Sequence, residues 1–375
     1  MGKKAIVAGH ICLDMTPVIE NKSASRVEEF FVPGRLLKTE AADVHTGGCV
    51  ANTGLGMKVL GADVKLIAKV GNDAFGEMVS NILNQYDAGE DLVVSEDKAT
   101  SYSMIMAVPG IDRIILHHSG VNDHFYSKDI SDKDLEETSL FHFGYPPLMK
   151  SMYENDAAEL KSLLKRVKEK GVVTSLDMAS IEPSSEAGQL DWKRLLSEIL
   201  PLTDCFLPSV EELCYILDRE RFAEWEERAA GQDVTSILDV ECDIAPLAKQ
   251  CMDMGAKILL IKCGAKGMYY CTAEKEKIAP VCEVLSLPEE EWVAQHGFEA
   301  SFVPEKILSG TGAGDTSIAA FLTAILQERT LKECVQLAAA TGASCVAAYD
   351  ALSGLKSFDE LTEKIQAGWK KVNEI

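Results

Sequence analysis

Residues 308–322 read LSGTGAGDTSIAAFL, a glycine-rich stretch that runs directly into an apolar segment of helical length. Glycine loses more conformational entropy on folding than any other residue, so a cluster of glycines before a helix needs a physical reason. Where side chains are missing, an anion can approach the backbone amides at the start of the helix, and the helix dipole adds positive potential there. The stretch therefore predicts a phosphate-binding loop at a helix N-terminus.

Asp315 lies in the first turn of this predicted helix. An isolated aspartate at such a position usually caps free amide groups. Beside a phosphate-binding loop, a carboxylate can also accept the proton of a substrate hydroxyl that attacks a phosphoryl group. The sequence contains neither the GxxxxGK[ST] pattern of P-loop proteins nor a G-x-G-x-x-G spacing at this loop. These residues favour phosphoryl transfer with Asp315 as the base.

The same segment resembles the C-terminal signature of the PfkB/ribokinase-like family of carbohydrate and nucleoside kinases, usually written Asp-Thr-Thr-Gly-Ala-Gly-Asp. The resemblance implies that Asp315 is the catalytic base. It also implies an anion hole formed by the backbone amides of Gly312, Ala313 and Gly314. Ser309 and Gly310 replace the leading Asp and Thr of the signature. Because that part of the signature helps to hold a monovalent cation in many members, the resemblance does not predict a K⁺ requirement here.

A second match lies in the N-terminal half, where residues 45–52 (HTGGCVAN) resemble the first signature of the same family. Paired glycines allow a substrate to approach the backbone closely, and an asparagine offers both donors and acceptors to sugar hydroxyls. Asp14 follows the first predicted strand and matches the family's substrate-binding aspartate, which accepts hydrogen bonds from ring hydroxyls. The residues expected to bind substrate are Asp14, Gly47, Gly48 and Asn52.

The middle of the chain matches the family more loosely. Asp177 retains the aspartate of the family's Asp-Pro-Asn-x-Arg segment, but its Asn and Arg are replaced. Glu212 is expected to order a Mg²⁺-bound water, with an exposed helical glutamate as the alternative. Residues 262–267 (KCGAKG) fit the nucleotide-side loop that follows a strand, with a solvent-exposed lysine as the alternative. The nucleotide contacts expected from this loop come from Lys262, Gly264 and Gly267.

Strand-like apolar runs alternate with amphipathic segments of helical length along the chain. Residues 4–8 and 65–70 are typical of buried strands, and residues 50–60 are typical of a helix. Strands that are apolar on both faces and separated by helices indicate a mostly parallel sheet covered by helices. With the family resemblance, this predicts a single ribokinase-like α/β domain over residues 1–375.

Two segments depart from that alternation. Residues 101–108 and 113–118 are alternating strands joined by a turn signal, which predicts a hairpin. Residues 16–44 are strand-like and rich in turns. We expect these segments to form a small β lid beside the main sheet, built from about 14–43 and 101–122.

The amino-acid composition argues against some classes of binding partner and favours one cellular compartment. The net charge of −22 argues against non-specific binding to nucleic acid and against binding to an anionic membrane surface. We expect no signal peptide and no membrane span, because no window approaches about 20 apolar residues. Eleven cysteines without a CxxC pair indicate reduced thiols and a cytoplasmic protein. Two charged segments, 219–243 and 285–304, look like insertions that form solvated surface.

These features predict ATP- and Mg²⁺-dependent phosphorylation of a hydroxyl group on a small sugar or sugar-like substrate. The alternatives are a nucleoside kinase and a non-catalytic sugar or nucleotide sensor on the same fold. The substrate motifs contain no basic cluster, which favours an unphosphorylated sugar over a sugar phosphate. Since family members often dimerise through the lid, a homodimer through this lid is also expected.

Overall fold

The computed structural model describes residues 2–19, 26–108 and 114–372. Within these residues the main feature is an eight-stranded sheet in the order β14-β13-β12-β11-β10-β9-β1-β4. All neighbouring strands from β12 to β4 run parallel, and β13 and β14 are antiparallel additions at one edge. The strands are β1 Lys4–Gly9, β4 Asp63–Ile67, β9 Leu140–Gly144, β10 Val173–Leu176, β11 Cys205–Phe206, β12 Ile258–Lys262, β13 Gly267–Thr272 and β14 His296–Ala300.

Each face of this sheet is buried under a separate hydrophobic core. Along β1, Ala5 and Val7 belong to one core, whereas Ile6 and Ala8 belong to the other. Helices that contribute to the first core are α2 Gly56–Val59, α3 Ala74–Asn84, α10 Lys275–Leu285, α11 Glu289–Trp292, α12 Ala313–Leu326, α13 Leu331–Cys345 and α14 Phe358–Gln366. Helices that contribute to the second are α4 Asp132–Glu136, α5 Lys150–Glu169, α6 Trp192–Ile199, α7 Val210–Leu217, α8 Arg219–Ala229 and α9 Ala245–Met254. The prediction of a mostly parallel sheet covered by helices is confirmed.

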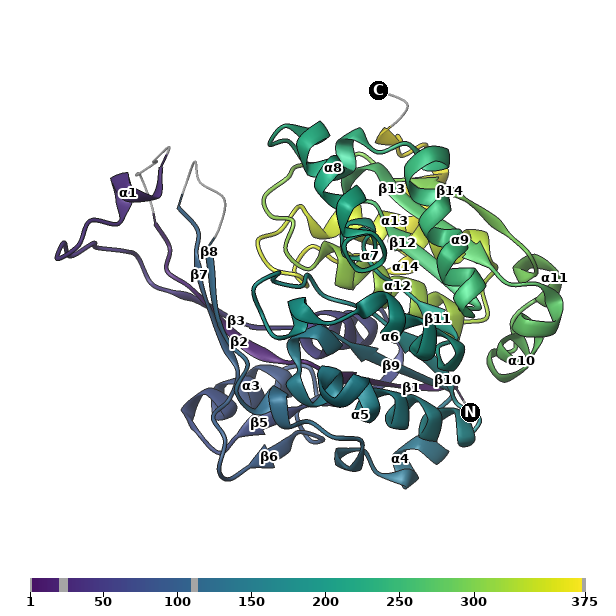
Figure 1. Ribbon diagram of the computed structural model, residues 1–375, viewed down its shortest axis with the longest axis horizontal. Helices are drawn as coiled ribbons and strands as arrows, with labels where there is room; N and C mark the ends of the chain where they lie inside the picture. Colours follow the sequence, from purple (N-terminus) through teal and green to yellow (C-terminus); the bar gives the residue numbers. More distant parts are fainter. Residues whose placement is uncertain (1, 20–25, 109–113, 373–375) are drawn as a thin grey trace.

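A second sheet, which we call the lid sheet, projects away from this body (Figure 1). Its strand order is β3-β2-β7-β8, and the hairpin predicted from the sequence is the antiparallel pair β7–β8. The turn signal of that hairpin lies outside the described residues. The strands of the lid sheet are β2 Cys12–Thr16, β3 Asp43–Gly47, β7 Tyr102–Met106 and β8 Ile114–His118.

Two expectations about strands are wrong in part. The segment 16–44 is strand only at its ends, because its described middle holds the short helix α1 Val27–Phe30 and irregular chain. The run 65–70 is divided at Ala68 between β4 and a separate strand, β5 Lys69–Gly71, which pairs with β6 Val93–Ser95. An apolar run alone does not reveal where a chain leaves one sheet for another.

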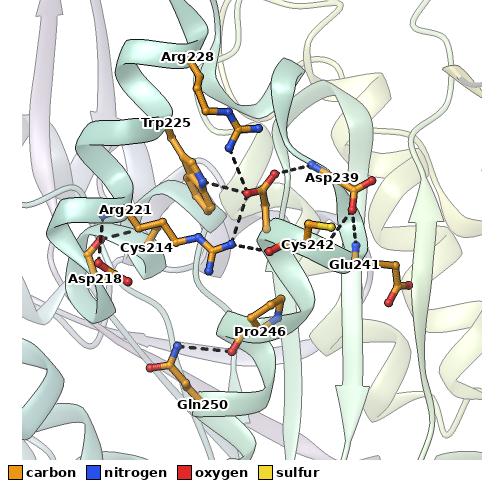
Figure 2. A network of polar contacts seen from close by, with 11 residues as sticks. Cys214, Asp218, Arg221, Trp225, Arg228, Asp239, Glu241, Cys242, Pro246 and Gln250 are labelled. Carbon is orange, nitrogen blue, oxygen red and sulfur yellow. Dashed lines mark hydrogen bonds and ion pairs between the residues drawn. The ribbon is translucent and has the colours of Figure 1, made fainter.

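The expectation of solvated surface at 219–243 is confirmed for most of the segment, whose side chains are exposed or half-buried, but it is wrong for Trp225 and Asp243. Figure 2 shows Arg221, Trp225 and Arg228, all on α8, pointing toward one carboxylate. That carboxylate belongs to the buried Asp243, which accepts hydrogen bonds from Trp225 Nε1 at 3.2 Å and from Arg228 Nη1 at 3.3 Å. The Trp225 ring is fully buried and packs into the second core.

The second insertion, 285–304, is also structural rather than merely solvated. Its acidic run begins the short helix α11 Glu289–Trp292, and Glu290 and Glu291 are exposed as expected. Trp292 and Phe302 are buried in the first core, and the segment between them supplies β14. Charge density therefore obscured one edge strand of the main sheet. No helix in the described part of the chain is both long and apolar enough to cross a membrane.

Candidate active site

Polar side chains follow the carboxyl ends of the parallel strands. His10 follows β1, Tyr145 follows β9, Asp177 follows β10, and Lys262 is the last residue of β12. Carboxyl ends of parallel strands meet at one edge of a sheet, and ligands of open α/β folds bind there. The candidate site is therefore this edge, together with the start of α12.

The carboxylate of Asp315 is buried and held by two donors, with a relative exposure of only 6%. The Tyr145 hydroxyl donates to Oδ1 at 2.6 Å, and the Asn52 side-chain amide donates to Oδ2 at 3.0 Å. Burial raises the pKa of Asp315, whereas the ammonium of Lys262 and the two donors act in the opposite direction. The predicted base and the predicted substrate residue Asn52 are thus direct neighbours.

The glycine loop before Asp315 is packed closely at Gly312 and makes an ordinary van der Waals contact at Gly314. Gly312 has a φ of +73°, and a Cβ there would lie 2.3 Å from Ala351 Cβ. At Gly314, a Cβ would lie 3.7 Å from the Lys262 ammonium nitrogen, so this cation sits beside the loop. Ala313 donates its amide to the Gly310 carbonyl at 3.3 Å. No side chain of the described residues caps α12, so its end presents positive potential toward the loop.

Lys262 and Asp177 form a buried hydrogen-bonded pair, which is an ion pair when the Asp177 carboxyl is ionised. Nζ lies 2.9 Å from Asp177 Oδ1, and the two side chains are 12% and 1% exposed. The alternative of a solvent-exposed lysine is therefore wrong. Burial raises the pKa of Asp177 to about 8, against the effect of Lys262. Burial lowers the pKa of Lys262, but the neighbouring carboxylates, first Asp177, outweigh it and the pKa is raised.

Glu212 and the loop glycines have local structural roles. The Glu212 carboxylate accepts the Ser209 amide at 2.8 Å in a capping box at the start of α7, and its side chain is half-buried rather than exposed. A Cβ at Gly264 would lie 2.5 Å from Thr235 Oγ1, and one at Gly267 would lie 2.1 Å from the Glu299 carbonyl. Both glycines thus pack against the inserted segments, and their nucleotide contacts stay a prediction.

On the lid side, Asp14 and the paired glycines come together. A Cβ at Gly47 would lie 2.0 Å from Asp14 Oδ2, and one at Gly48 would lie 2.5 Å from His10 Nδ1. The Cys12 thiol donates to Asp14 Oδ1 at 3.2 Å, and burial raises the pKa of Asp14. The glycine pair is required by these approaches of the lid sheet and of the loop after β1.

Sequence reasoning missed Tyr145 and the pair formed by His10 and His117. The Nε2 atoms of the two histidines are 3.3 Å apart and join the loop after β1 to β8. Burial lowers the pKa of His10 to about 3, so this imidazole is neutral. For Tyr145 a signal existed, since residues 144–147 (GYPP) are a turn signal directly after the run 140–143 (LFHF). The described residues contain no cluster of three or more His, Cys, Asp and Glu side chains arranged to hold a metal ion.

Comparison with known proteins gives the following matches. Residues 18–357 match the family described as pfkB family carbohydrate kinase. An uncharacterised sugar kinase of Archaeoglobus fulgidus is 24% identical over 305 residues, which cover 80% of this chain and 98% of the relative. A nucleoside kinase of Methanocaldococcus jannaschii is 22% identical over 373 residues, which cover 97% of both chains. The solved structure of Arabidopsis thaliana ribokinase complexed with ribose and ATP has a TM-score of 0.69 at 18% identity, covering 97% of this chain and 98% of that chain, and shows the shared fold.

Proposed function

Because this chain belongs to the pfkB carbohydrate kinase family, we propose that it transfers the γ-phosphoryl group of ATP to a hydroxyl group of a small, unphosphorylated sugar or sugar-like molecule. The observation that carries the proposal is the buried Asp315 carboxylate, held by two donors at the start of α12 beside the Lys262 ammonium. A base, a helix N-terminus and a cation at one place are the parts that phosphoryl transfer requires.

The residues at this edge fit a nucleotide's phosphate groups. A helix N-terminus without a side-chain cap and a buried ammonium beside Gly314 both attract anions. Mg²⁺-ATP, when bound, supplies the phosphoryl group, and its metal neutralises part of the charge. We assign the nucleotide contacts to Lys262, Gly264 and Gly267, and the ordering of a metal-bound water to Glu212. Nothing around Ser309 and Gly310 leads us to propose a K⁺ requirement.

In the proposed mechanism, Asp14, the backbone at Gly47 and Gly48, and Asn52 bind and orient the substrate hydroxyls. Asp315 accepts the proton of the attacking hydroxyl, which makes the oxygen a better nucleophile. Amides at the start of α12 stabilise the negative charge on the transferred group; we assign them to the three residues Gly312, Ala313 and Gly314. The lid sheet covers the substrate and excludes water, which limits wasteful hydrolysis.

The face of the lid sheet that carries Asp14 supports our proposal for the substrate class. In the strand register, Asp14 lies beside His45 and Ser103, and Ser103 lies beside His117. This cross-strand row contains a carboxylate, a hydroxyl and imidazoles, and no Lys or Arg. Such a row suits hydroxyl groups and offers no permanent cation to a second phosphate. A neutral polyhydroxy compound is therefore the substrate that we propose.

The test is ATP consumption by purified protein with Mg²⁺ across a panel of sugars, sugar acids, sugar phosphates and nucleosides. We expect one class of unphosphorylated alcohol to stimulate turnover, and Asp315→Asn to lower kcat by about 10²–10⁴-fold while ATP still binds. Asp253→Asn, an exposed aspartate on α9, is the matched control and should keep wild-type turnover. Full activity of Asp315→Asn would refute the role of the base, and ATP binding without stimulated turnover would favour a sensor.

We also propose that two copies associate through the lid sheet and that the protein works in the cytoplasm. Its strand β8 lies at the edge of the lid sheet in the described part of the chain, and Ile115 and Leu116 on it are 53% and 57% exposed. An exposed apolar edge strand is typical of an interaction surface.

The proposal of a cytoplasmic protein rests on the cysteines. All eleven cysteines are free, which suits a reducing compartment.

A further inference from the structure

Tyr145 adopts a backbone conformation that ordinary side chains avoid. Its φ and ψ are 65° and 41°, in the left-handed region, and it is followed directly by Pro146 and Pro147. Non-glycine residues rarely occupy this region, because Cβ then crowds the carbonyl oxygen, and such residues cluster at functional sites. The surrounding structure must therefore hold Tyr145 in place.

That support comes from the end of β9. A Cβ at Gly144 would lie 1.9 Å from Cys49 Sγ, so the strand is pressed against the segment that carries the glycine pair. The left-handed turn then directs the Tyr145 ring toward His10, with ring centroids 5.9 Å apart, and its hydroxyl toward Asp315. The strained residue thus connects the substrate side of the site with the base.

The contact between the two side chains is a short hydrogen bond to a carboxylate. The Tyr145 hydroxyl lies 2.6 Å from Asp315 Oδ1, within the range of charge-assisted O–H···O⁻ bonds, which are about twice as strong as neutral ones. Burial, followed by the carboxylates of Asp315 and Asp177, raises the pKa of Tyr145 well above its ordinary value. The hydroxyl therefore keeps its proton and donates it to this bond at every working pH.

We propose that Tyr145 is a positioning residue for the base: its hydroxyl fixes the Asp315 carboxylate toward the substrate and keeps it ionised. This inference rests on the proposed function for Asp315. Each carboxylate oxygen has two lone pairs, and Tyr145 and Asn52 occupy one on each oxygen. A remaining lone pair can accept the substrate proton. Without the phenol, burial favours the protonated carboxyl, which cannot act as a base.

Removing only the phenol oxygen tests this role, because the other groups that face Asp315 stay in place. They come from the glycine-pair segment, the loop after β10, α7, β12 and α13. These groups are Cys49, Asp177, Glu212, Lys262 and Cys345. Tyr145→Phe also keeps the ring and the backbone turn. A matched control is Tyr215→Phe on α7, which removes a buried hydroxyl that has no hydrogen-bond partner among the described residues.

In steady-state kinetics we expect Tyr145→Phe to lower kcat at neutral pH by roughly 10- to 100-fold, because the variant loses one hydrogen bond to a charged group. The KM for ATP should stay near the wild-type value. The acid limb of the kcat–pH profile should move to higher pH, so that much of the activity returns in alkaline buffer. Tyr215→Phe should leave kcat and the profile unchanged. A loss of the same size at every pH, or no loss, would overturn the proposal.

A second measurement does not depend on turnover. In protein labelled with ¹³C at the aspartate carboxyls, the resonance that Asp315→Asn removes identifies Asp315. Its titration midpoint should lie at higher pH in Tyr145→Phe than in the wild type and in Tyr215→Phe. Equal midpoints would refute the inference even if the protein is a kinase. Shifted midpoints in a protein without kinase activity would refute the proposed function, but they would still show that the Tyr145 hydrogen bond lowers the pKa of Asp315.

Discussion

Replacing Lys262 with methionine should destabilise the fold by an amount that depends on pH. The substitution keeps most of the apolar stem and removes the cation that pairs with Asp177 Oδ1 at 2.9 Å. Asp177 is 1% exposed, and its Oδ2 has no hydrogen-bond partner among the described residues. The remaining carboxyl can therefore stay charged at a high cost or bind a proton.

The size of the effect follows from the pKa of Asp177. Burial raises this pKa to about 8 in the folded protein, and the unfolded value is about 4. The native state therefore binds the extra proton, and the stabilising contribution is lost as pH rises through the folded pKa. Without the ammonium the folded pKa is higher still, so the variant continues to lose stability above pH 8, where the wild type no longer does.

At pH 6 the carboxyl is neutral in both proteins, and the variant loses mainly a hydrogen bond, about 1–3 kcal/mol. Above pH 8 the difference should grow by about 1.4 kcal/mol per pH unit. At pH 9.5 this adds about 2 kcal/mol, which brings the total to the 3–5 kcal/mol typical of a broken buried ion pair.

Urea unfolding followed by circular dichroism at pH 6 and pH 9.5 measures both values. The double variant Lys262→Met with Asp177→Asn should lose the pH dependence, because no buried carboxyl remains at that position. Lys249→Met, which breaks an exposed pair on α9 with side chains 74% and 65% exposed, should change stability by less than about 0.5 kcal/mol at either pH. A Lys262→Met deficit that is equal at both pH values would refute the reasoning.

Two further predictions concern the lid sheet. Gly47→Ala places a Cβ 2.0 Å from Asp14 Oδ2, so the Asp14 carboxyl must move. Because this carboxyl is proposed to bind the substrate, the KM for the sugar should rise at least about 10-fold, while the KM for ATP should not change. An unchanged sugar KM would remove Asp14 from the substrate site. Leu116→Glu adds a charge to the exposed edge strand and should convert a dimer into monomers in sedimentation velocity without changing the melting temperature. A monomeric wild-type protein would contradict the lid dimer.

The sequence predicted those parts of the fold and site that depend on local chain chemistry. Apolar runs such as 4–8 became central strands, and the glycines at 312 and 314 mark the start of α12. Asp315 was proposed as the base because the glycines directly before it and the apolar helix directly after it can be read from consecutive residues. Such signals can be recognised from a few consecutive residues, without knowing which residues distant in sequence pack against them.

The partners of Asp315 could not be predicted in this way. Tyr145 is 170 residues away from it in sequence, Asn52 is 263 residues away, and Lys262 lies 85 residues from Asp177. Which strand ends become neighbours depends on the strand order, and the sequence shows only that strands are present. The buried part of the segment 219–243 was missed for a related reason, because its charges suggested solvent while Asp243 is buried beside two arginines.

The strongly acidic composition poses a problem for the proposed binding of ATP, whose phosphate groups are also negatively charged, and the groups around the glycine loop offer a solution. Surface charges act through water and are screened within about 10 Å at 0.1 M salt, so the net charge of −22 acts weakly on a buried site. The potential at the glycine loop depends instead on nearby groups of low exposure. There the ammonium of Lys262 and the end of α12 oppose the carboxylates of Asp177 and Asp315. Protonation of Asp177, whose pKa is about 8, would shift this local balance toward positive potential, so we expect phosphate affinity to be more sensitive to pH than to salt.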